Sequence, residues 1–412
     1  MARIVLKFGG TSVADTERIE RAADKVAREV ALGHQVAVIV SAMSGVTNQL
    51  VEHCRSITPV YDAREYDAVV SSGEQVTAGL MAIALQKRGI EARSWQGWQV
   101  PILCSEVHGK ARIEDIDGSK MSRHLERGQV AVLAGFQGVT ERNRIATLGR
   151  GGSDTTAVAL AVALNADRCD IYTDVDGVYT TDPRIVKAAR KISKISYEEM
   201  LELASLGAKV LQTRSVEMAY KNDMPLQVLS SFEDAIGSDL PGTLVTREED
   251  IMEQQLVNGV AYAKNEAKIT LFDVPDIPGL AAEVFGPLTD SEINVDMIVQ
   301  NISADGKVTD ITFTVPEDEL DRAVDCVKMN DKLKDVNLRF DKDVVKISVV
   351  GIGMISHAGV AQTMFRTLAD KNINIQVIST SEIKISVIID KEYLELAVRA
   401  LHTAYGLDEK KA

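Results

Sequence analysis

The 412-residue sequence predicts an α/β protein: a three-layer α/β/α domain on a mainly parallel sheet, followed by two small ferredoxin-like domains of the βαββαβ type. Two observations predict this. Short apolar runs such as RIVLKF, QVAVIV and QVAVLAGF alternate with helix-length segments up to about residue 245, a pattern typical of strands covered on both faces. Beyond that point a strand–turn–helix–strand pattern occurs twice, which indicates an internal repeat.

The order of these patterns divides the chain into four parts. The α/β domain takes residues 1–245, a charged connecting segment takes 246–263, and the repeats take 264–341 and 342–412. The repeats share one register, because Gly279, Phe285 and Asn294 recur 80 residues later as Gly359, Phe365 and Asn374. Each repeat reads β-α-β-β-α, so we expect its last strand to be short or supplied from elsewhere.

Composition excludes several classes of function. A net charge of −14 argues against a nucleic-acid or anionic-membrane surface, because both require a basic face. No apolar stretch approaches the roughly 20 residues that cross a bilayer, so we expect a cytoplasmic protein. The four cysteines lack CxxC spacing, which argues against a disulfide framework or a structural zinc site. Because the chain is acidic overall, any phosphate site must be confined to a small group of basic residues.

Three glycine-containing loops each follow an apolar run and precede a helical pattern: KFGGTS at 7–12, SAMSGVTNQ at 41–49 and GRGGSDTT at 149–156. Backbone N–H groups and helix N-termini of such loops can converge on a phosphate. None of the three is a Walker A or GxGxxG motif. A single glycine pair is more often a tight turn, but three loops with Lys7 and Arg150 beside two of them predict an anion site.

These motifs also carry a family resemblance. KFGGTSV, VSAMSGVTNQL, SSGEQV, GRGGSDTTAVALA and TDVDGVYTTDPR, followed by two repeats containing EIN or NIN, resemble the aspartokinases, amino acid kinases with a C-terminal pair of ACT domains. The resemblance covers essentially the whole chain. It implies transfer of the ATP γ-phosphoryl group to the side-chain carboxylate of L-aspartate, giving 4-phospho-L-aspartate and ADP at the first step of lysine, threonine and methionine biosynthesis.

The implied acceptor needs no general base, because an aspartate side chain titrates near pH ~3.9 and is already an anion. The site must instead supply cations. Lys7 is the candidate to bridge the phosphates, with Gly9 and Gly10 allowing close backbone approach. The alternative is a strand-end lysine whose ammonium reaches solvent. Mg²⁺ is expected on the ATP phosphates, without a protein-built metal site.

Recognition of free aspartate needs partners for its α-carboxylate and its α-ammonium group. Arg150 offers a planar fork for the α-carboxylate, and Glu74 and Asp154 are candidate acceptors for the ammonium. We assign Asp154 a catalytic role in orienting the reactants; the alternative is an N-cap of a helix starting at Thr155. The resemblance implies a substrate site made of Thr47, Glu74, Arg150, Gly151, Ser153 and Asp154.

The segment TDVDGVYTTDPR, at 173–184, contains a D-G turn and a D-P step, which predict a loop after the CDIYT strand. Ordinary solvent-facing turn chemistry is the alternative for any one of its residues. The resemblance implies an ATP site made of Lys7, Phe8, Gly9, Gly10, Ser41, Thr173, Asp174, Tyr179, Asp182, Arg184, Lys209 and Val210.

The repeats resemble ACT domains, which bind small amino acids in the loop between the first strand and the helix. Here those loops are 273–281 and 353–361, and their glycines would expose N–H groups to a carboxylate. The resemblance implies inhibition by lysine, threonine or both, and pairing of ACT domains in a homodimer or higher oligomer. It places one effector pocket at Asp273, Ile277, Gly279, Ala281 and Gln300, and a second at Asp296, Ser356, Val360, Ser379, Thr380, Ser381 and Glu382.

Two other readings compete with this one. Glutamate 5-kinase, acetylglutamate kinase and uridylate kinase share the GG loop, but SGEQV and tandem ACT repeats do not belong with them. A catalytically inactive amino-acid sensor is the second alternative. Its expected signature is loss of Lys7, Glu74, Arg150 or Asp154, and all four are present.

Overall fold

The computed structural model describes residues 1–206, 210–251, 256–302, 307–330, 333, 336–357 and 359–408. The chain forms two compact units. The first unit comprises Met1–Val178, Lys191–Ser205 and Lys209–Glu253, and the second comprises Tyr179–Arg190, Leu206–Ala208 and Gln254–Ala412.

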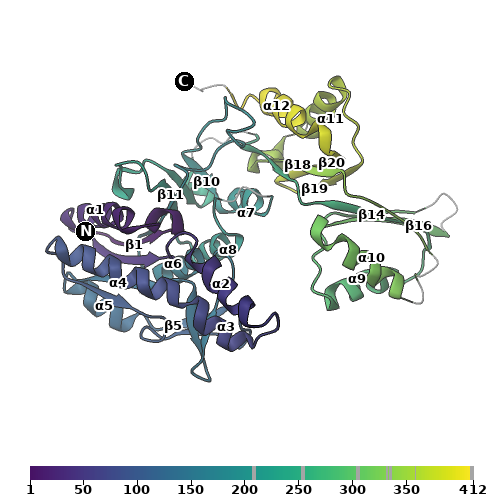
Figure 1. The fold of residues 1–412 in the computed structure, drawn as a ribbon. Helices are drawn as coiled ribbons and strands as arrows, with labels where there is room; N and C mark the ends of the chain where they lie inside the picture. Colours follow the sequence, from purple (N-terminus) through teal and green to yellow (C-terminus); the bar gives the residue numbers. More distant parts are fainter. Residues whose placement is uncertain are drawn as a thin grey trace. The chain divides into compact units, whose positions relative to one another are not determined.

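The first unit is built on an eight-stranded sheet with the strand order β10-β12-β11-β9-β1-β2-β6-β3 (Figure 1). Neighbouring strands run parallel except β11 and β12. The mainly parallel sheet expected from the buried apolar runs is therefore confirmed. The strands are β1 (Arg3–Phe8), β2 (Gln35–Val40), β3 (Ala92–Trp95), β6 (Val130–Ala134), β9 (Arg168–Thr173), β10 (Lys194–Ser196), β11 (Leu226–Ser230) and β12 (Thr243–Thr246).

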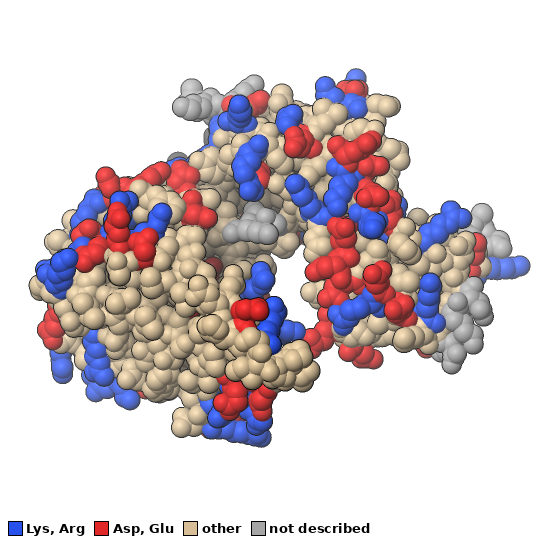
Figure 2. Space-filling model, viewed as in Figure 1, with Lys and Arg blue, Asp and Glu red and all other residues tan. Residues whose placement is uncertain are grey.

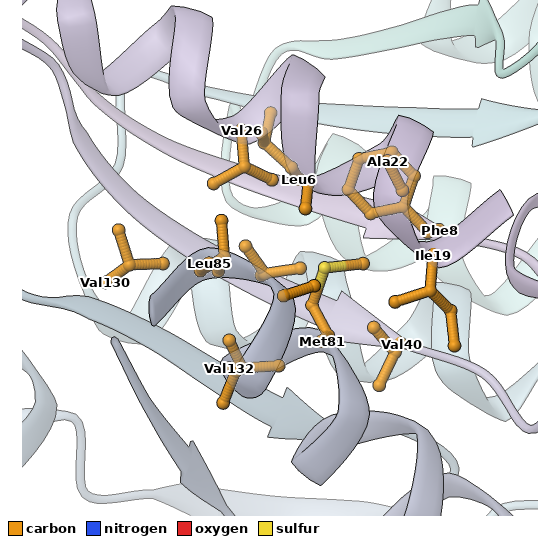
Figure 3. Close-up of a cluster of buried hydrophobic side chains, with 14 of the residues drawn as sticks. Leu6, Phe8, Ile19, Ala22, Val26, Val40, Met81, Leu85, Val130 and Val132 are labelled. Atoms are coloured by element: carbon orange, nitrogen blue, oxygen red, sulfur yellow. The ribbon is translucent and has the colours of Figure 1, made fainter. Parts of the chain in front are cut away.

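Helices cover both faces of this sheet. Leu6 and Phe8 of β1 pack with Ile19 of α1 and Met81 of α4 in one apolar cluster (Figure 3). Lys7 lies between them in sequence and points to the opposite face, toward α6, because side chains alternate along a strand. The helices are α1 (Thr16–Ala31), α2 (Val46–Ile57), α3 (Ala63–Val70), α4 (Ser72–Lys87), α5 (Ser119–Glu126), α6 (Gly152–Ala163), α7 (Tyr197–Ser205) and α8 (Thr213–Lys221), with short turns η1 (Gly10–Val13), η2 (Gly237–Asp239) and η3 (Glu248–Asp250).

A second, four-stranded sheet in this unit has the order β5-β4-β7-β8. Its strands are β4 (Ile102–Cys104), β5 (Ile113–Ile116), β7 (Gln137–Thr140) and β8 (Ile145–Thr147). β8 ends just before the GRGGSD loop, so this small sheet leads the chain into that loop. The stretch Ala63–Lys87 is long and apolar enough to cross a membrane, but 56% of its most apolar window is buried, as in a core helix.

The second unit contains the two repeats, each with a four-stranded antiparallel sheet and two helices. Gly279 and Gly359 take the left-handed conformation at φ 94° and 105°, and Glu292 and Asn372 do so at 56° and 57°. The predicted register of 80 residues is thus visible in the backbone. The elements are β14 (Ala267–Pro275), α9 (Leu280–Asp290), β15 (Ile298–Ile302), β16 (Val308–Val315), η4 (Glu317–Glu319), α10 (Leu320–Met329), β17 (Asn337–Asp341), β18 (Val344–Val350), η5 (Ile352–Ser356), α11 (Val360–Asp370), β19 (Val377–Thr380), β20 (Lys384–Asp390), η6 (Lys391–Tyr393) and α12 (Leu394–Ala404).

The two repeats obtain their fourth strand differently. The first repeat uses its own β17 beside β14, whereas the second uses β13 (Gly259–Ala263), which precedes the first repeat in the chain and pairs with β18. The connecting segment expected at 246–263 is therefore corrected, because its last five residues form a strand in the sheet of the second repeat. The physical reason is that β13 covers an edge of β18 that would otherwise lack hydrogen-bond partners.

The segment Tyr179–Arg190 is also built into the second unit. The Thr180 carbonyl accepts a 2.8 Å hydrogen bond from Val260 N–H, and the Thr180 hydroxyl lies 2.9 Å from His402 Nε2. Val186 joins the apolar core of the second repeat. The first domain, expected as one continuous stretch from residue 1 to 245, therefore lacks this segment.

On the face shown in Figure 2, acidic and basic side chains of the described residues occur in small mixed groups. No continuous basic stripe is visible among the described residues on that face.

Candidate active site

Lys7 lies at the carboxyl end of β1, between the parallel neighbours β2 and β9. Its side chain is buried, with 8% of the residue exposed, and its Nζ lies 2.6 Å from Asp154 Oδ1. The alternative of a strand-end lysine with its ammonium in solvent is therefore wrong. The carboxyl ends of strands in an open parallel sheet are the usual location of a ligand site.

Asp154 lies in the first turn of α6, whose N-cap is Gly151 with φ 69°. The alternative that Asp154 caps a helix starting at Thr155 is therefore wrong, since the helix begins at Gly152. The aligned peptide dipoles give this helix end a partial positive charge, which stabilises a carboxylate and favours a bound anion. Lys7 and the α6 N-terminus thus place two positive groups at one point.

Gly9 and Gly10 leave room beside the Lys7 ammonium. A Cβ on Gly9 would lie 3.2 Å from Lys7 Nζ, and a Cβ on Gly10 would lie 3.1 Å from the carbonyl oxygen of Ala42. Ala42 follows Ser41, whose N–H donates to the Phe8 carbonyl at 3.1 Å. The GG loop and the SAMSG loop are therefore adjacent, and side chains at either glycine would fill the space where an anion can approach the backbone.

Glu74 lies in the first turn of α4 and is 4% exposed. Burial raises its pKa to about 7, although N–H groups of Ala42 and of Glu74 itself donate to the carboxylate. Its Oε2 has no hydrogen-bond partner among the described residues. Gly73 permits the approach of α4, since a Cβ there would lie 2.8 Å from the Ala42 Cβ. A buried acceptor without a partner, beside the glycine loops, fits a cationic ligand group.

Arg150 is exposed, between Gly149 at φ 77° and Gly151 at φ 69°. Within the described residues, no hydrogen bond or ion pair holds its guanidinium, which leaves the fork available to a carboxylate. Ser153 packs against Gly135 at the end of β6, where a Cβ would lie 2.9 Å from the Ser153 Oγ. Thr47 lies half-buried in the first turn of α2.

Next to Thr173, where the nucleotide is expected, the structure brings together two serines that the sequence analysis did not name as site residues. The Thr173 carbonyl, at the end of β9, accepts from Ser231 N–H at 2.9 Å and from the Ser231 hydroxyl at 2.7 Å. The Ser12 hydroxyl donates in turn to Ser231 Oγ at 2.8 Å. The sequence signal for these serines was the SSF segment at the carboxyl end of β11, because the carboxyl ends of neighbouring parallel strands meet at one edge of the sheet.

The other residues of the expected ATP site have mixed surroundings. Phe8 is buried and stacks on Tyr172 with ring centroids 4.8 Å apart, so only its backbone remains for a ligand. Asp182 lies in the second unit, where the Arg184 guanidinium lowers its pKa to about 2 and the Tyr262 hydroxyl donates to it at 2.8 Å. The roles expected for Asp174, Tyr179, Asp182, Arg184 and Val210 stay predictions, and Lys209 lies outside the described residues.

The first expected effector pocket surrounds the start of α9. Gly279 is the N-cap of that helix, and Asp273 takes φ 54° where the pairing of β14 with β16 shifts register. Ile277, Ala281 and Gln300 are exposed. Open backbone next to exposed side chains is compatible with a small ligand, and the pocket stays a prediction.

The second expected pocket is spread along α11, β19 and the turn after it. Val360 is the first residue of α11, and Ser379 and Thr380 end β19, an edge strand. Ser381 and Glu382 are exposed in the turn before β20. The side chain of Ser356 lies outside what the structure describes.

Asp296 has a partner that the sequence analysis did not foresee. Lys346 of β18 donates to the carboxylates of Asp296 and Glu266, the latter at 2.5 Å. Burial lowers the pKa of Lys346, but the two carboxylates outweigh it and the pKa is raised. For Glu266 burial outweighs Lys346, and its pKa is also raised. The acid expected to bind an effector ammonium thus already pairs with the protein's own ammonium.

Comparison with known proteins shows which family the chain belongs to. The sequence model of the amino acid kinase family matches residues 2–230, and ACT domain models match residues 268–328 and 347–405. The chain is 54% identical over 412 residues to the aspartate kinase of Pseudomonas putida, covering 99% of this chain and 98% of that protein. The chain belongs to the aspartokinases. The aspartokinase of Corynebacterium glutamicum is 47% identical over 413 residues, with 99% and 97% coverage.

Solved aspartokinases share the fold. Escherichia coli aspartokinase III in complex with aspartate and ADP, in the R-state, has a TM-score of 0.80 at 28% identity, covering 97% of this chain and 99% of that one. The same enzyme with lysine and aspartate, in the T-state, has a TM-score of 0.75 at 28% identity, with 97% and 98% coverage. The predicted order of an amino acid kinase domain followed by two ACT domains is thereby confirmed.

Proposed function

We propose that the chain transfers the γ-phosphoryl group of ATP to the side-chain carboxylate of L-aspartate. A carboxylate oxygen forms a bond to Pγ, the bond from Pγ to the β–γ bridging oxygen breaks, and ADP leaves with the electron pair. The products are 4-phospho-L-aspartate and ADP. The observation that carries the proposal is the buried ammonium of Lys7 at the strand ends, beside the N-terminus of α6.

Lys7 and the α6 N–H groups counter the repulsion between two anionic reactants. As charge spreads over the transferring group, fixed donors stabilise it without reorganising at the moment of reaction. Asp154 holds the Lys7 ammonium in place through its 2.6 Å contact, which makes it an orienting group. No proton is transferred, so a base is not required.

Glu74 and Arg150 bind the other two charges of aspartate. The unpartnered Oε2 of Glu74 accepts from the substrate ammonium, and that contact favours the ionised form of a carboxyl whose pKa burial has raised to about 7. Arg150 pairs with the α-carboxylate through its planar fork. The complex of E. coli aspartokinase III with aspartate and ADP supports these substrates.

Mg²⁺ enters with ATP, bound to its phosphates, as in phosphoryl transfer generally. Within the described part of the chain, no three His, Cys, Asp or Glu side chains are grouped so that they could hold a metal ion. We assign the ion to the substrate, as is usual for phosphoryl transfer from ATP. Neutralising phosphate charge is its contribution when bound.

We further propose that the ACT repeats sense the end products lysine and threonine of the pathway that this reaction opens. The lysine-bound T-state of E. coli aspartokinase III supports an effector role for lysine. Asp296 is half exposed, so a lysine ammonium can compete with Lys346 for its carboxylate. β15 and β19 each form one edge of a repeat's sheet. We expect the ACT repeats to pair in a homodimer or higher oligomer of a cytoplasmic enzyme.

A coupled assay of ADP release tests the proposal, with aspartate, glutamate and UMP as alternative acceptors. Of these three acceptors, we expect only aspartate to support turnover. No turnover with aspartate, or faster turnover with another acceptor, would overturn it. Lysine and threonine, added singly and together, test the regulatory part, which fails if neither slows the reaction.

A further inference from the structure

Asp67 is a buried carboxylate outside the site described so far. It lies on α3, which ends at Val70, just before the helix that carries Glu74. Its side chain is completely buried. A buried carboxylate is retained only where donors satisfy its oxygens, so its partners indicate what it does.

Those partners come from two other segments of the first unit. Thr147, the last residue of β8, donates its N–H to Asp67 Oδ2 at 3.1 Å and its hydroxyl to Oδ1 at 2.5 Å. Gly109 N–H donates at 3.1 Å, and His108 Nδ1 lies 2.8 Å away. His108 Nε2 is buried without a hydrogen-bond partner within the described residues, so the contact with Asp67 orients the ring. One carboxylate thus joins α3, the end of β8 and the loop around residue 109.

The segment fixed in this way leads directly into the Arg150 loop. Thr147 is followed by Leu148, Gly149 and Arg150. The Arg214 guanidinium donates to the carbonyl of Leu148 at 2.8 Å, which secures the same stretch from another side. Beyond Leu148, however, glycines flank Arg150, and glycine leaves the backbone many conformations. The last rigid point before Arg150 is therefore the stretch that Asp67 and Arg214 hold.

We propose that Asp67 is a positioning residue for aspartate binding, since it fixes the Arg150 loop relative to the helix that presents Glu74. This rests on the proposed function, in which Arg150 and Glu74 bind aspartate. The nucleotide side is built on β1, β9 and Ser231, none of which contacts Asp67 through a hydrogen bond within the described residues. Loss of Asp67 should therefore affect one substrate and spare the other.

Asp67→Asn tests this in the full-length chain. The amide keeps the shape but has one acceptor oxygen, and its NH₂ group faces donors. We expect the KM for aspartate to rise roughly tenfold or more, because small displacements of binding groups have effects of that order, with the KM for ATP unchanged within about twofold. A purely structural role would instead lower thermal stability while leaving the ratio of the two KM values unchanged.

Thr147→Val and Thr147→Ser form a matched pair that decides the matter if Asp67→Asn does not fold. Valine removes only the hydroxyl that donates to Asp67, whereas serine retains it. We expect Thr147→Val to raise the KM for aspartate about threefold to tenfold and Thr147→Ser to resemble the wild type. The decisive measurement is whether the KM for aspartate rises while the KM for ATP stays the same.

Two failures are distinguishable. A wild-type chain that does not phosphorylate aspartate overturns the proposed function itself. A wild type that does so, with folded Asp67→Asn or Thr147→Val variants that change both KM values equally or change neither, overturns only the role of Asp67.

Discussion

Both units bury a lysine against carboxylates, and the surroundings of the two lysines differ. Lys7 is the penultimate residue of β1, next to two glycines and the N-terminus of α6, and pairs with Asp154. Lys346 lies within β18, with Glu266 and Asp296 as partners. Both lysines lie between two neighbouring strands, but Lys7 also lies beside a glycine pair and the N-terminus of a helix.

Under the proposed function, this difference separates a catalytic ion pair, Lys7 with Asp154, from a stabilising one. Removing one partner of a buried pair is costly because the other charge is left without compensation. Asp154 keeps compensation from the α6 N-terminus if Lys7 is lost, whereas Glu266 lies directly before the strand β14 and, among the described elements, not in the first turn of a helix. We therefore expect Lys7 to matter for turnover and Lys346 for stability.

The largest expected effect belongs to Lys346→Met. The free energy of unfolding of the second unit should fall by about 3 to 5 kcal/mol, because the nearly buried Glu266 loses its counter-charge. Denaturant unfolding followed by circular dichroism measures this. Lys371→Met, at an exposed position on the same unit, is the control and should change stability little. Equal stability of the two variants would show that Lys346 does not stabilise the second unit.

Lys7→Met should lower kcat by about 10²- to 10³-fold, the usual effect of losing one preorganised donor to a transition state. Its free energy of unfolding should change by only about 1 kcal/mol, because the α6 N-terminus still stabilises Asp154. Steady-state kinetics and denaturant unfolding measure the two quantities. Lys87→Met, which removes a surface pair with Glu20, is the control. If Lys7→Met loses stability as Lys346→Met does, the contrast between the lysines is wrong.

The pH dependence of aspartate binding tests Glu74. Its carboxyl, with a pKa of about 7, holds a proton below that value and cannot then accept from the substrate ammonium. The KM for aspartate should therefore rise up to about tenfold per pH unit below 7, and Glu74→Gln should remove this dependence. Kinetics at a series of pH values check it; a wild-type KM that is flat across this range contradicts the role of Glu74.

The raised pKa of Glu74 also predicts how stability depends on pH: a higher pH should favour aspartate binding but lower the free energy of unfolding. In the unfolded chain its carboxyl ionises near 4.5, so the free energy of unfolding should fall as the pH rises from there to about 7. Glu74→Gln buries no charge and should be at least as stable as the wild type above pH 7. A marked loss of stability in this variant would show that the buried carboxylate is compensated in the free protein.

The smallest expected effect concerns the effector. Thr380→Ile or Ser381→Phe should fill the second pocket and raise the lysine concentration for half inhibition by about fivefold or more, with turnover unchanged. Inhibition curves of each variant measure this. Unchanged inhibition in both variants would place the effector elsewhere.

The sequence predicted features that depend on local pattern. Alternating buried strands and helices gave the mainly parallel sheet, and the recurrence of Gly279 at Gly359 gave the repeats. Lys7 was a candidate because a cation before two glycines at a strand end predicts an anion site, and its role in binding stays a prediction. The helix start at Gly152 was placed three residues late, since the preference of Asp for N-caps outweighed the left-handed Gly151.

Other features depend on contacts between distant segments. β13 reads as part of a charged connector, and only its pairing with β18 makes it a strand of the second repeat. Asp67 and Thr147 are 80 residues apart, and nothing local to either residue indicates their contact. The pairing of Asp296 with Lys346 is similarly nonlocal.

Chemical rescue of Lys7→Ala tests most directly whether a positive charge at this strand end brings the two anions together. With saturating ATP and aspartate, we predict that this folded variant turns over about 10²- to 10³-fold more slowly than the wild type, and that added ethylammonium, but not ethanol, restores part of the rate. A Lys7→Ala variant that phosphorylates aspartate at the wild-type rate without added amine would contradict the account.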